Sequence, residues 1–206
     1  MYLLKVRKCV NFRCTFFNNT AITFGAALFS EGHIEFIINL LPTFTNNNAI
    51  TGGCMKIDKI NLIQNYGCSF TSNHAKISGG IYCISDVKKL MNRNSIFTLN
   101  TCKINGIIAE IMYNTLVINE NCTFTNNKAR KGCFWIGHSK IIKNILCKIS
   151  NNTVYIGGFI AIQNITILYS FGCNFSNNIA ESHSGIYSVR EAHKIMNKNC
   201  VFYKNR

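Results

Sequence analysis

The chain has 206 residues, of which 48% are hydrophobic, and its 22 Lys and Arg residues against 8 Asp and Glu give a formal net charge of +14. This composition indicates a folded protein and excludes a disordered one. No window approaches the roughly 18 apolar residues of a membrane-spanning helix. The positive charge favours encounter with polyanions but predicts no specific nucleic-acid site.

A motif of an aromatic or aliphatic residue followed three places later by asparagine recurs along the whole chain. The spacing between copies is 25 to 28 residues, which is typical of a solenoid whose repeats stack on one another. We expect the asparagines to form a hydrogen-bonded ladder between stacked repeats, as amides do in cross-β assemblies. The eight pairs are Phe16/Asn19, Phe44/Asn47, Phe70/Asn73, Phe97/Asn100, Phe124/Asn127, Ile149/Asn152, Phe175/Asn178 and Phe202/Asn205.

Further residues recur at fixed distances from the aromatic marker. Cysteine usually stands two places before it, so both side chains face inward from one strand. A small residue, usually alanine, follows five places after it, and glycines such as Gly52-Gly53 and Gly79-Gly80 come next. Glycine permits a corner between two strands. A second apolar run and a third segment then complete the repeat.

These features predict an all-β fold, a single-stranded parallel β-helix of about seven rungs of 25 to 28 residues, each built from three short strands and three turns. The structural alternative is a leucine-rich repeat, whose period and Leu-x-Leu-x-x-Asn pattern are similar. Leucine is scarce, with 11 residues against 30 isoleucines, and a strand-like run follows the glycines where that fold has a helix.

One β-helix domain is predicted over residues 1–206. The repeat begins almost at once and stops within a unit at Arg206, without the polar caps of a complete solenoid. We therefore expect a fragment of a longer protein with incomplete terminal rungs. The first residues, Met-Tyr-Leu-Leu-Lys-Val-Arg, do not have the pattern of a secretory signal.

The Phe-x-x-Asn motif and a second signature, Gly-Gly-Ala-Ile, together resemble the repeats of the chlamydial polymorphic outer membrane proteins and related surface proteins of parasitic microbes. The second signature is degraded here, as in Gly79-Gly80-Ile81-Tyr82 and Gly157-Gly158-Phe159-Ile160. The resemblance covers nearly the whole chain. It implies a right-handed β-helix, exposed at the cell surface or secreted, that is associated with adhesion.

No residue set predicts catalysis, a metal site or a cofactor. The eleven cysteines contain no Cys-x-x-Cys pair, so we expect buried free thiols. Polysaccharide lyases and hydrolases on this fold need clustered carboxylates, and only Asp58, Asp86 and Glu110 could approach one another across rungs. We expect no enzyme. A carbohydrate-active β-helix is the alternative, and a partial or decayed gene product without independent function is a third.

Basic residues 15 to 19 places after their markers predict a broken stripe that could hold an anionic ligand. The partners expected are host or cell-surface glycans or proteins, and the alternative is a solvated edge. The stripe comprises Lys59, Lys88, Lys89, Lys140, Lys143, Arg190 and Lys194. Sequons make five asparagines candidates for glycosylation in an exported protein: Asn18, Asn121, Asn151, Asn164 and Asn174.

Overall fold

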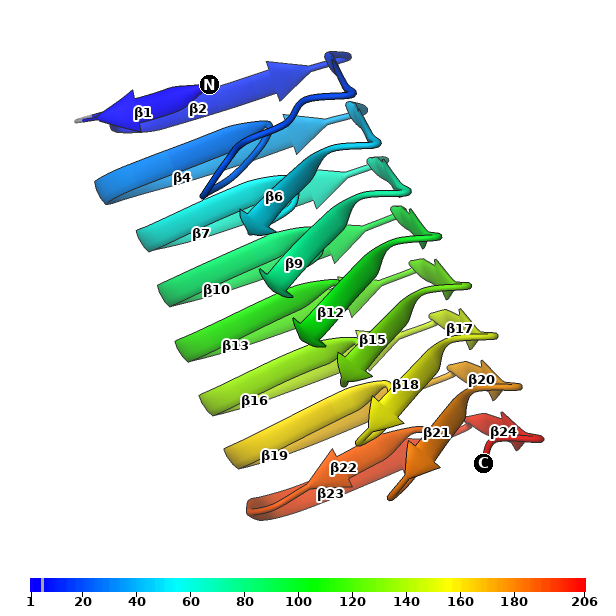
Figure 1. Cartoon of the computed structure of the whole chain (residues 1–206). Coiled ribbons are helices and arrows are strands. Elements are labelled where there is room, and N and C mark those ends of the chain that lie inside the picture. Colours follow the sequence, from blue (N-terminus) through cyan, green and yellow to red (C-terminus); the bar gives the residue numbers. More distant parts are fainter. Residues whose placement is uncertain (5) are drawn as a thin grey trace.

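The computed structural model describes residues 1–4 and 6–206, and every regular element in this part of the chain is a β-strand. The strands pair in parallel and stack as a β-helix of about seven rungs, a rung being one complete turn of the chain (Figure 1). The predicted all-β solenoid is thereby confirmed. The leucine-rich alternative is excluded, because a strand stands where that fold has a helix.

Sheet A is the longest of three sheets and has ten strands. Its interior strands each contain 12 or 13 residues. They are β4 (Leu28–Leu40), β7 (Met55–Tyr66), β10 (Tyr82–Arg93), β13 (Ala109–Glu120), β16 (Phe134–Ile145) and β19 (Ile160–Phe171). At the ends of the sheet lie β1 (Tyr2–Leu4), β2 (Lys8–Phe12), β22 (Tyr187–Val189) and β23 (Ala192–Lys198).

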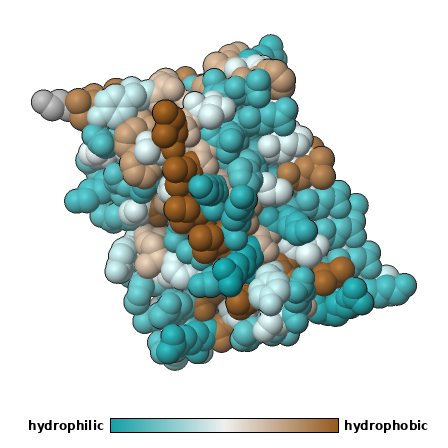
Figure 2. All heavy atoms as spheres, in the orientation of Figure 1, coloured by the Kyte–Doolittle hydropathy of each residue, from teal (hydrophilic) through white to brown (hydrophobic). Residues whose placement is uncertain are grey.

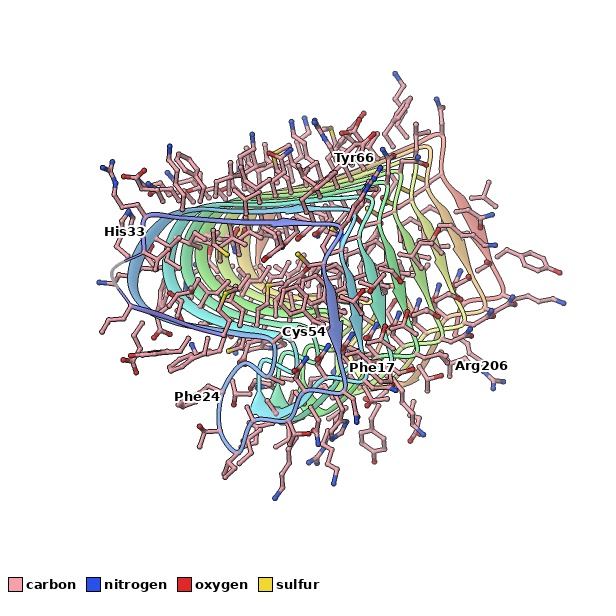
Figure 3. All side chains as sticks on the ribbon, turned by 90° about the horizontal axis from the view of Figure 1, so that it is seen from above. Phe17, Phe24, His33, Cys54, Tyr66 and Arg206 are labelled. Atoms are coloured by element: carbon pink, nitrogen blue, oxygen red, sulfur yellow. The ribbon has the colours of Figure 1, made fainter. Side chains whose placement is uncertain are left out.

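The long strands differ from the three short strands per rung that the sequence predicted. Each of them bends halfway, so one strand forms two sides of the coil, and His33 marks the bend of β4 in the view along the axis (Figure 3). Single residues with positive φ make the bend, among them Asp86 (54°), Tyr113 (53°) and His138 (50°). None of these three residues is glycine, so the sequence does not indicate that the strand bends there and continues. The sequence therefore predicted two separate strands at this place.

Sheets B and C complete each rung with short strands. Sheet B contains the aromatic marker and comprises β3 (Thr15–Phe17), β5 (Thr43–Thr45), β8 (Ser69–Thr71), β11 (Ile96–Thr98), β14 (Thr123–Thr125), β17 (Lys148–Ser150), β20 (Asn174–Ser176) and β24 (Val201–Tyr203). Sheet C follows the asparagine and comprises β6 (Asn48–Thr51), β9 (His74–Ser78), β12 (Thr101–Asn105), β15 (Lys128–Lys131), β18 (Thr153–Ile156) and β21 (Ile179–Ser182).

The glycine site forms the corner between sheet C and sheet A. Gly79 has a φ of 61°, and a Cβ atom there would lie 2.0 Å from the carbonyl oxygen of Tyr82. Gly80 has no such φ, but its Cβ would lie 2.5 Å from the carbonyl oxygen of Ile107 in the next rung. The two glycines thus serve different purposes, one for backbone conformation and the other for close approach between rungs.

Identical side chains stack in columns inside the coil, where a column is the set of residues at one place in successive rungs. The marker rings of Phe44 and Phe70 stack with centroids 4.8 Å apart and planes 5° from parallel. Phe97 and Phe124 continue the stack at 4.7 Å, and Ile149 then interrupts it. Buried side chains from sheet A, mostly isoleucine but also Met55, Tyr82 and Phe134, fill most of the remaining core.

The asparagines after the markers form a continuous ladder, the marker ladder. In the interior, Asn100 Nδ2 donates to Asn127 Oδ1 at 3.1 Å and to the Phe70 carbonyl at 2.9 Å. Its Oδ1 accepts from both the side chain and the backbone N–H of Asn73, at 3.0 and 2.9 Å. The Asn100 amide therefore donates two hydrogen bonds and accepts two. Asparagine side chains thus provide hydrogen-bond partners for the backbone groups at the buried corner between sheets B and C.

The marker ladder passes without interruption through the rung whose marker is not aromatic. Asn178 accepts from Asn152 Nδ2 at 2.9 Å and donates to Asn205 Oδ1 at 2.9 Å. Its second Nδ2 hydrogen goes to the backbone carbonyl of Ile149 at 2.9 Å. A carbonyl acceptor does not depend on the side chain of its residue, so isoleucine interrupts the ring stack and leaves the ladder intact.

A second ladder, which the sequence interpretation missed, lies five places before the marker. Asn39 donates to Asn65 at 2.7 Å, and the same Nδ2-to-Oδ1 bond links Asn65 to Asn92 at 2.8 Å. The ladder begins at Asn11 and continues through Asn119 to Asn144, and Ser170 then takes the place of asparagine. Its signal was present as a column of asparagines at a constant offset.

The cysteines are mostly interior side chains, as predicted. All eleven are free, and nine are buried, whereas Cys14 is exposed and Cys200 is intermediate. The column contains Cys68, Cys122, Cys147 and Cys173, and Cys54 also points into the coil (Figure 3). Burial raises the pKa of Cys68 to about 12, which keeps this thiol protonated at neutral pH.

The marker ladder predicts a large difference between two Asn→Ala substitutions. Asn100→Ala removes four hydrogen bonds and leaves buried donors and acceptors without partners, so we expect a loss of about 3 kcal/mol or more in the free energy of unfolding. Asn48→Ala, at an exposed position of β6, should cost less than about 0.5 kcal/mol. Urea denaturation measures both, and equal losses would contradict the role of the ladder.

Thiol burial predicts a sharp order of reactivity. In the native protein a thiol-specific reagent at pH 8 should modify Cys14 first and Cys200 more slowly, while the nine buried cysteines stay protected because the folded coil keeps the reagent away from their sulfur atoms. Unfolding without reductant should release all eleven. Rapid native labelling of more than two groups, or a shortfall after unfolding, would contradict the free, buried assignment.

Candidate functional site

The outer surface of sheet C carries the densest set of basic side chains that lies within one sheet. We call these five exposed residues the basic face: Lys76, Lys103, Lys128, Arg130 and Lys131. They come from three consecutive strands, β9, β12 and β15. Because the strands are parallel and in register, residues at equivalent places are separated by only about 4.8 Å per rung.

The register between these strands aligns three residues of the basic face in one column. Ala75 pairs with Cys102 and Cys102 with Ala129, so the residues that follow them, Lys76, Lys103 and Arg130, come at successive levels of the coil. The paired residues themselves, Ala75, Cys102 and Ala129, point inward and are buried. Inward alanine or cysteine next to outward lysine or arginine is the ordinary alternation of a strand with one buried face.

Extra residues in β9 and β12 widen this surface. The register shifts where β9 pairs with β6 and where β12 pairs with β15, as expected for a bulge that places two residues opposite one. As a result Ile77 follows Lys76 and Ile104 follows Lys103, with Ile77 43% exposed. Figure 2 shows a line of apolar side chains running beside hydrophilic ones along the molecule. In sheet C, the exposed Ile77 and the half-buried Ile104 each follow a lysine of the basic face.

A shallow groove of about 550 Å³ runs over the same strands. Its lining combines Lys103, Lys128 and Arg130 with the hydroxyl groups of Thr101 and Thr153. Tyr155 and Glu181 lie at the end nearer the C-terminus. The groove therefore offers cations, hydroxyl groups and the rings of His74 and Tyr155 across five rungs.

The charges of the basic face are not neutralised by neighbouring carboxylates. The ion pairs in residues 1–4 and 6–206 are Arg7–Glu35, Lys56–Asp58 and Arg93–Glu120, and none of them includes a residue of this face. Its electrostatic effect reaches His74, whose Nδ1 lies 2.7 Å from Thr101 Oγ1. Burial and then the nearby Lys103 cation lower the pKa of His74 below its usual value.

Six of the seven predicted stripe residues lie on sheet A and Arg190 lies between β22 and β23, and the seven are not brought together as one surface. Lys59 and Lys88 share a small hollow with His33 and Asp86 at the bend. Lys88 and Lys140 occupy one column but lie two rungs apart, and Lys89 and Lys194 occupy another, four rungs apart. Lys143 is half-buried beyond them, and Arg190 is at the final rung. Their role in ligand binding stays a prediction.

The ladder asparagines named from the sequence lie inside the coil and offer no surface for a ligand. The six interior members are buried: Asn47, Asn73, Asn100, Asn127, Asn152 and Asn178. Asn178 is only 1% exposed although it stands one rung from the C-terminal end, because Asn205 covers it. Asn19 and Asn205, at the two ends, are partly exposed. The ladder is therefore a structural element and forms no part of the candidate binding surface.

The sequence interpretation missed the basic face because it considered positions 15 to 19 after the marker. The residues of this face stand four to seven places after the marker, where Lys76, Lys103 and Arg130 share one offset. That shared offset was the available signal. The bulges that place the isoleucines beside them leave no comparable signal.

The acidic residues considered for catalysis occupy separate columns. Lys56 pairs with Cys83 and Cys83 with Glu110, whereas Asp58 and Asp86 lie further along their strands toward the bend. Asp58 accepts a hydrogen bond from Lys56 at 2.6 Å, and Glu110 accepts one from Asn105 at 3.4 Å. Within the described ranges, no three His, Cys, Asp or Glu side chains are grouped so that they could hold a metal ion.

All five sequon asparagines are exposed, so none is sterically withheld from modification. Asn18, Asn121, Asn151 and Asn164 have positive φ, between 50° and 62°, and stand at the turns that flank sheet B or at the bend of sheet A. Asn174 lies in β20. Whether they carry glycans stays a prediction.

Comparisons with known proteins found no match to this chain. No family model matches the chain, and neither the curated proteins nor the solved structures contain a match. Over the described residues, no helix is long and apolar enough to cross a membrane.

The coupling between His74 and the basic face can be measured directly. Lys103→Gln removes a neighbouring cation, so the pKa of His74 should rise toward its ordinary value without reaching it, because burial still opposes protonation. An NMR titration of the imidazole protons reports this shift. Lys140→Gln removes the same charge from sheet A and should leave the pKa of His74 unchanged; an equal response to both substitutions would contradict the local effect.

Proposed function

We propose that this chain is a non-enzymatic β-helix for adhesion or structural display at a cell surface or in secreted form, and that its basic face binds an acidic glycan. The observation that carries the proposal is the column Lys76, Lys103 and Arg130, which stacks three like charges on successive rungs without carboxylate partners.

Such a column has an energetic cost in the free protein. Like charges directly opposite one another on neighbouring strands destabilise a sheet, and the interior columns of this protein avoid the problem with uncharged side chains. A linear polyanion lying along the coil would offset that repulsion at every rung. The column thus has the geometry for a repeating anionic ligand.

The lining favours a glycan over a nucleic acid. Thr101 and Thr153 provide hydroxyl groups for sugar hydroxyls, and Ile77 and Tyr155 provide apolar surface for the C–H faces of sugar rings. Sequence-tolerant binding of single-stranded nucleic acid uses several exposed aromatic platforms for successive bases, and the rings that line this groove are those of the exposed Tyr155 and the half-buried His74, three rungs apart.

The surface or secreted location rests on the resemblance of the repeats to those of the chlamydial polymorphic outer membrane proteins. Five exposed sequon asparagines are consistent with an exported protein in a host that glycosylates. The rigid coil, with ladders running along it, suits display because each rung repeats the same outward positions.

The triple variant Lys76→Gln/Lys103→Gln/Arg130→Gln tests this assignment. With heparin as the probe at about 0.15 M salt, we expect affinity to fall roughly tenfold to a hundredfold, because three exposed ion pairs of about 0.5 to 1 kcal/mol each are lost. Titration calorimetry measures the affinity. Binding by the wild-type protein should also weaken as salt is raised.

A matched control removes three charges from sheet A. Lys59→Gln/Lys88→Gln/Lys140→Gln has the same net charge as the test variant, so a non-specific charge effect would weaken both equally. That result would overturn the basic face as the site. Loss confined to the control variant would instead favour the stripe predicted from sequence. Tighter binding of single-stranded DNA than of heparin would overturn the glycan assignment.

A further inference from the structure

A second groove, of about 490 Å³, lies at the glycine corner between sheet C and sheet A. We call it the tryptophan groove, because Trp135, the single tryptophan of the chain, lines it. Sheet C contributes Lys131 and Ile156, and sheet A contributes Ala161 and Gln163 as well as Trp135. The strands of these five residues are paired on both sides, so the groove belongs to the side of the coil and not to its ends.

The tryptophan groove is shaped by a step in side-chain size along one outward column. Glu110 pairs with Trp135, Trp135 with Ala161, and Ala161 with Ser188, so two small side chains follow the indole at the next two levels. Gly157 lies beside them, and a Cβ atom there would lie 3.3 Å from the Cβ of Ala161. A floor of small residues is therefore built next to the largest side chain of the column.

Polar and basic groups border this floor on both sides. Gln163 stands two residues after Ala161 in β19, roughly 7 Å along the same outward face. Arg190 comes at the next level, where its backbone N–H donates to the Ile162 carbonyl at 3.0 Å. Lys131 lies on the sheet C side, and none of the described residues that line the groove is acidic. The tryptophan groove thus combines an apolar ring with uncompensated positive charge.

We propose that the tryptophan groove binds one sugar ring of an acidic glycan, with that ring lying against the indole of Trp135. The inference rests on the proposed function, because it gives the same glycan a second contact. A sugar ring has an apolar C–H face and a rim of hydroxyl groups. The indole presents a large flat apolar surface to the C–H face, and the Gln163 amide both donates to and accepts from hydroxyl groups. Lys131 and Arg190 would pair with a carboxylate or sulfate of the ring.

The tryptophan groove continues the groove of the basic face around the corner. Arg130 and Tyr155 line the groove of the basic face, and the residues that directly follow them, Lys131 and Ile156, line the tryptophan groove. Adjacent residues of a strand are only about 3.3 Å apart along its axis. One glycan chain can therefore contact both grooves, crossing from sheet C to sheet A at the level of β15 and β18.

The single tryptophan makes occupation of the groove directly measurable. Trp135 is half-buried, so acrylamide should quench its fluorescence in the free protein. Saturating heparin should reduce this quenching. Polyphosphate, which has the charges without sugar rings, should bind the basic face and leave the quenching unchanged. Heparin binding without any shielding of Trp135 would overturn the site, and equal shielding by both polymers would overturn its assignment to a sugar ring.

Two substitutions test the groove at outward positions, away from the core. Trp135→Ala should weaken heparin binding by about twofold to tenfold, the loss expected for one aromatic contact. Ala161→Leu fills the floor at a half-buried position and should weaken binding similarly while keeping the tryptophan. Both variants should bind polyphosphate like the wild type. Tyr113→Ala removes an exposed ring at the bend of sheet A, outside both grooves, and should bind heparin like the wild type.

The binding constants separate this inference from the proposed function. Wild-type heparin affinity in Trp135→Ala and Ala161→Leu, with a loss in the triple variant of the basic face, would overturn the tryptophan groove alone. A loss in these two variants, with wild-type affinity in the triple variant, would overturn the basic face and support the tryptophan groove. A wild-type protein that binds no heparin would overturn both.

Discussion

The structure depends on a side-chain amide that completes the hydrogen bonding of a buried corner. Between sheets B and C the chain turns sharply, and a turn inside a stack of rungs would leave backbone groups without water or strand partners. Each marker asparagine supplies both missing partners, because it donates to the marker carbonyl of the rung before and accepts from the amide of that rung's own asparagine. The chain can therefore turn sharply between sheets B and C without leaving these backbone groups unpaired.

This constraint explains why so much of the fold was readable from sequence. A residue that must hydrogen-bond to its own copy one rung away recurs at a fixed interval, and the inward cysteine and phenylalanine recur with it because stacked columns pack like on like. The glycine pair was readable for a different reason, since a Cβ atom at Gly79 or Gly80 would overlap a neighbouring carbonyl oxygen. Positions at which only one residue type fits the structure therefore give a clear pattern in the sequence.

Structural features that several residue types can form were not predicted from the sequence. The bend in sheet A needs only one residue with positive φ, and Asp86, Tyr113, His138 and Asn164 all provide it. The ladder of Asn39 and Asn65 does not stand out in the sequence, because the chain has 29 asparagines and many of them lie at turns. The placing of Ile77 and Ile104 beside the basic face depends on bulges, and a one-residue bulge cannot be predicted until the partner strand is known. The sequence therefore indicated the architecture better than the ligand surface.

The two ladders also divide each rung into a part of fixed length and a part of variable length. The distance from Asn39 to Asn47 along the chain is the same as that from Asn92 to Asn100 and from Asn144 to Asn152, although the rungs differ by up to three residues. The differences in length fall outside this segment, at the bend of sheet A, at the bulges of sheet C and at the glycine corner between these two sheets. Inherited insertions and deletions can therefore accumulate on the outer sides of the coil while the segment between the ladders keeps its length. New surface shapes can thus evolve while the segment between the two ladders stays unchanged.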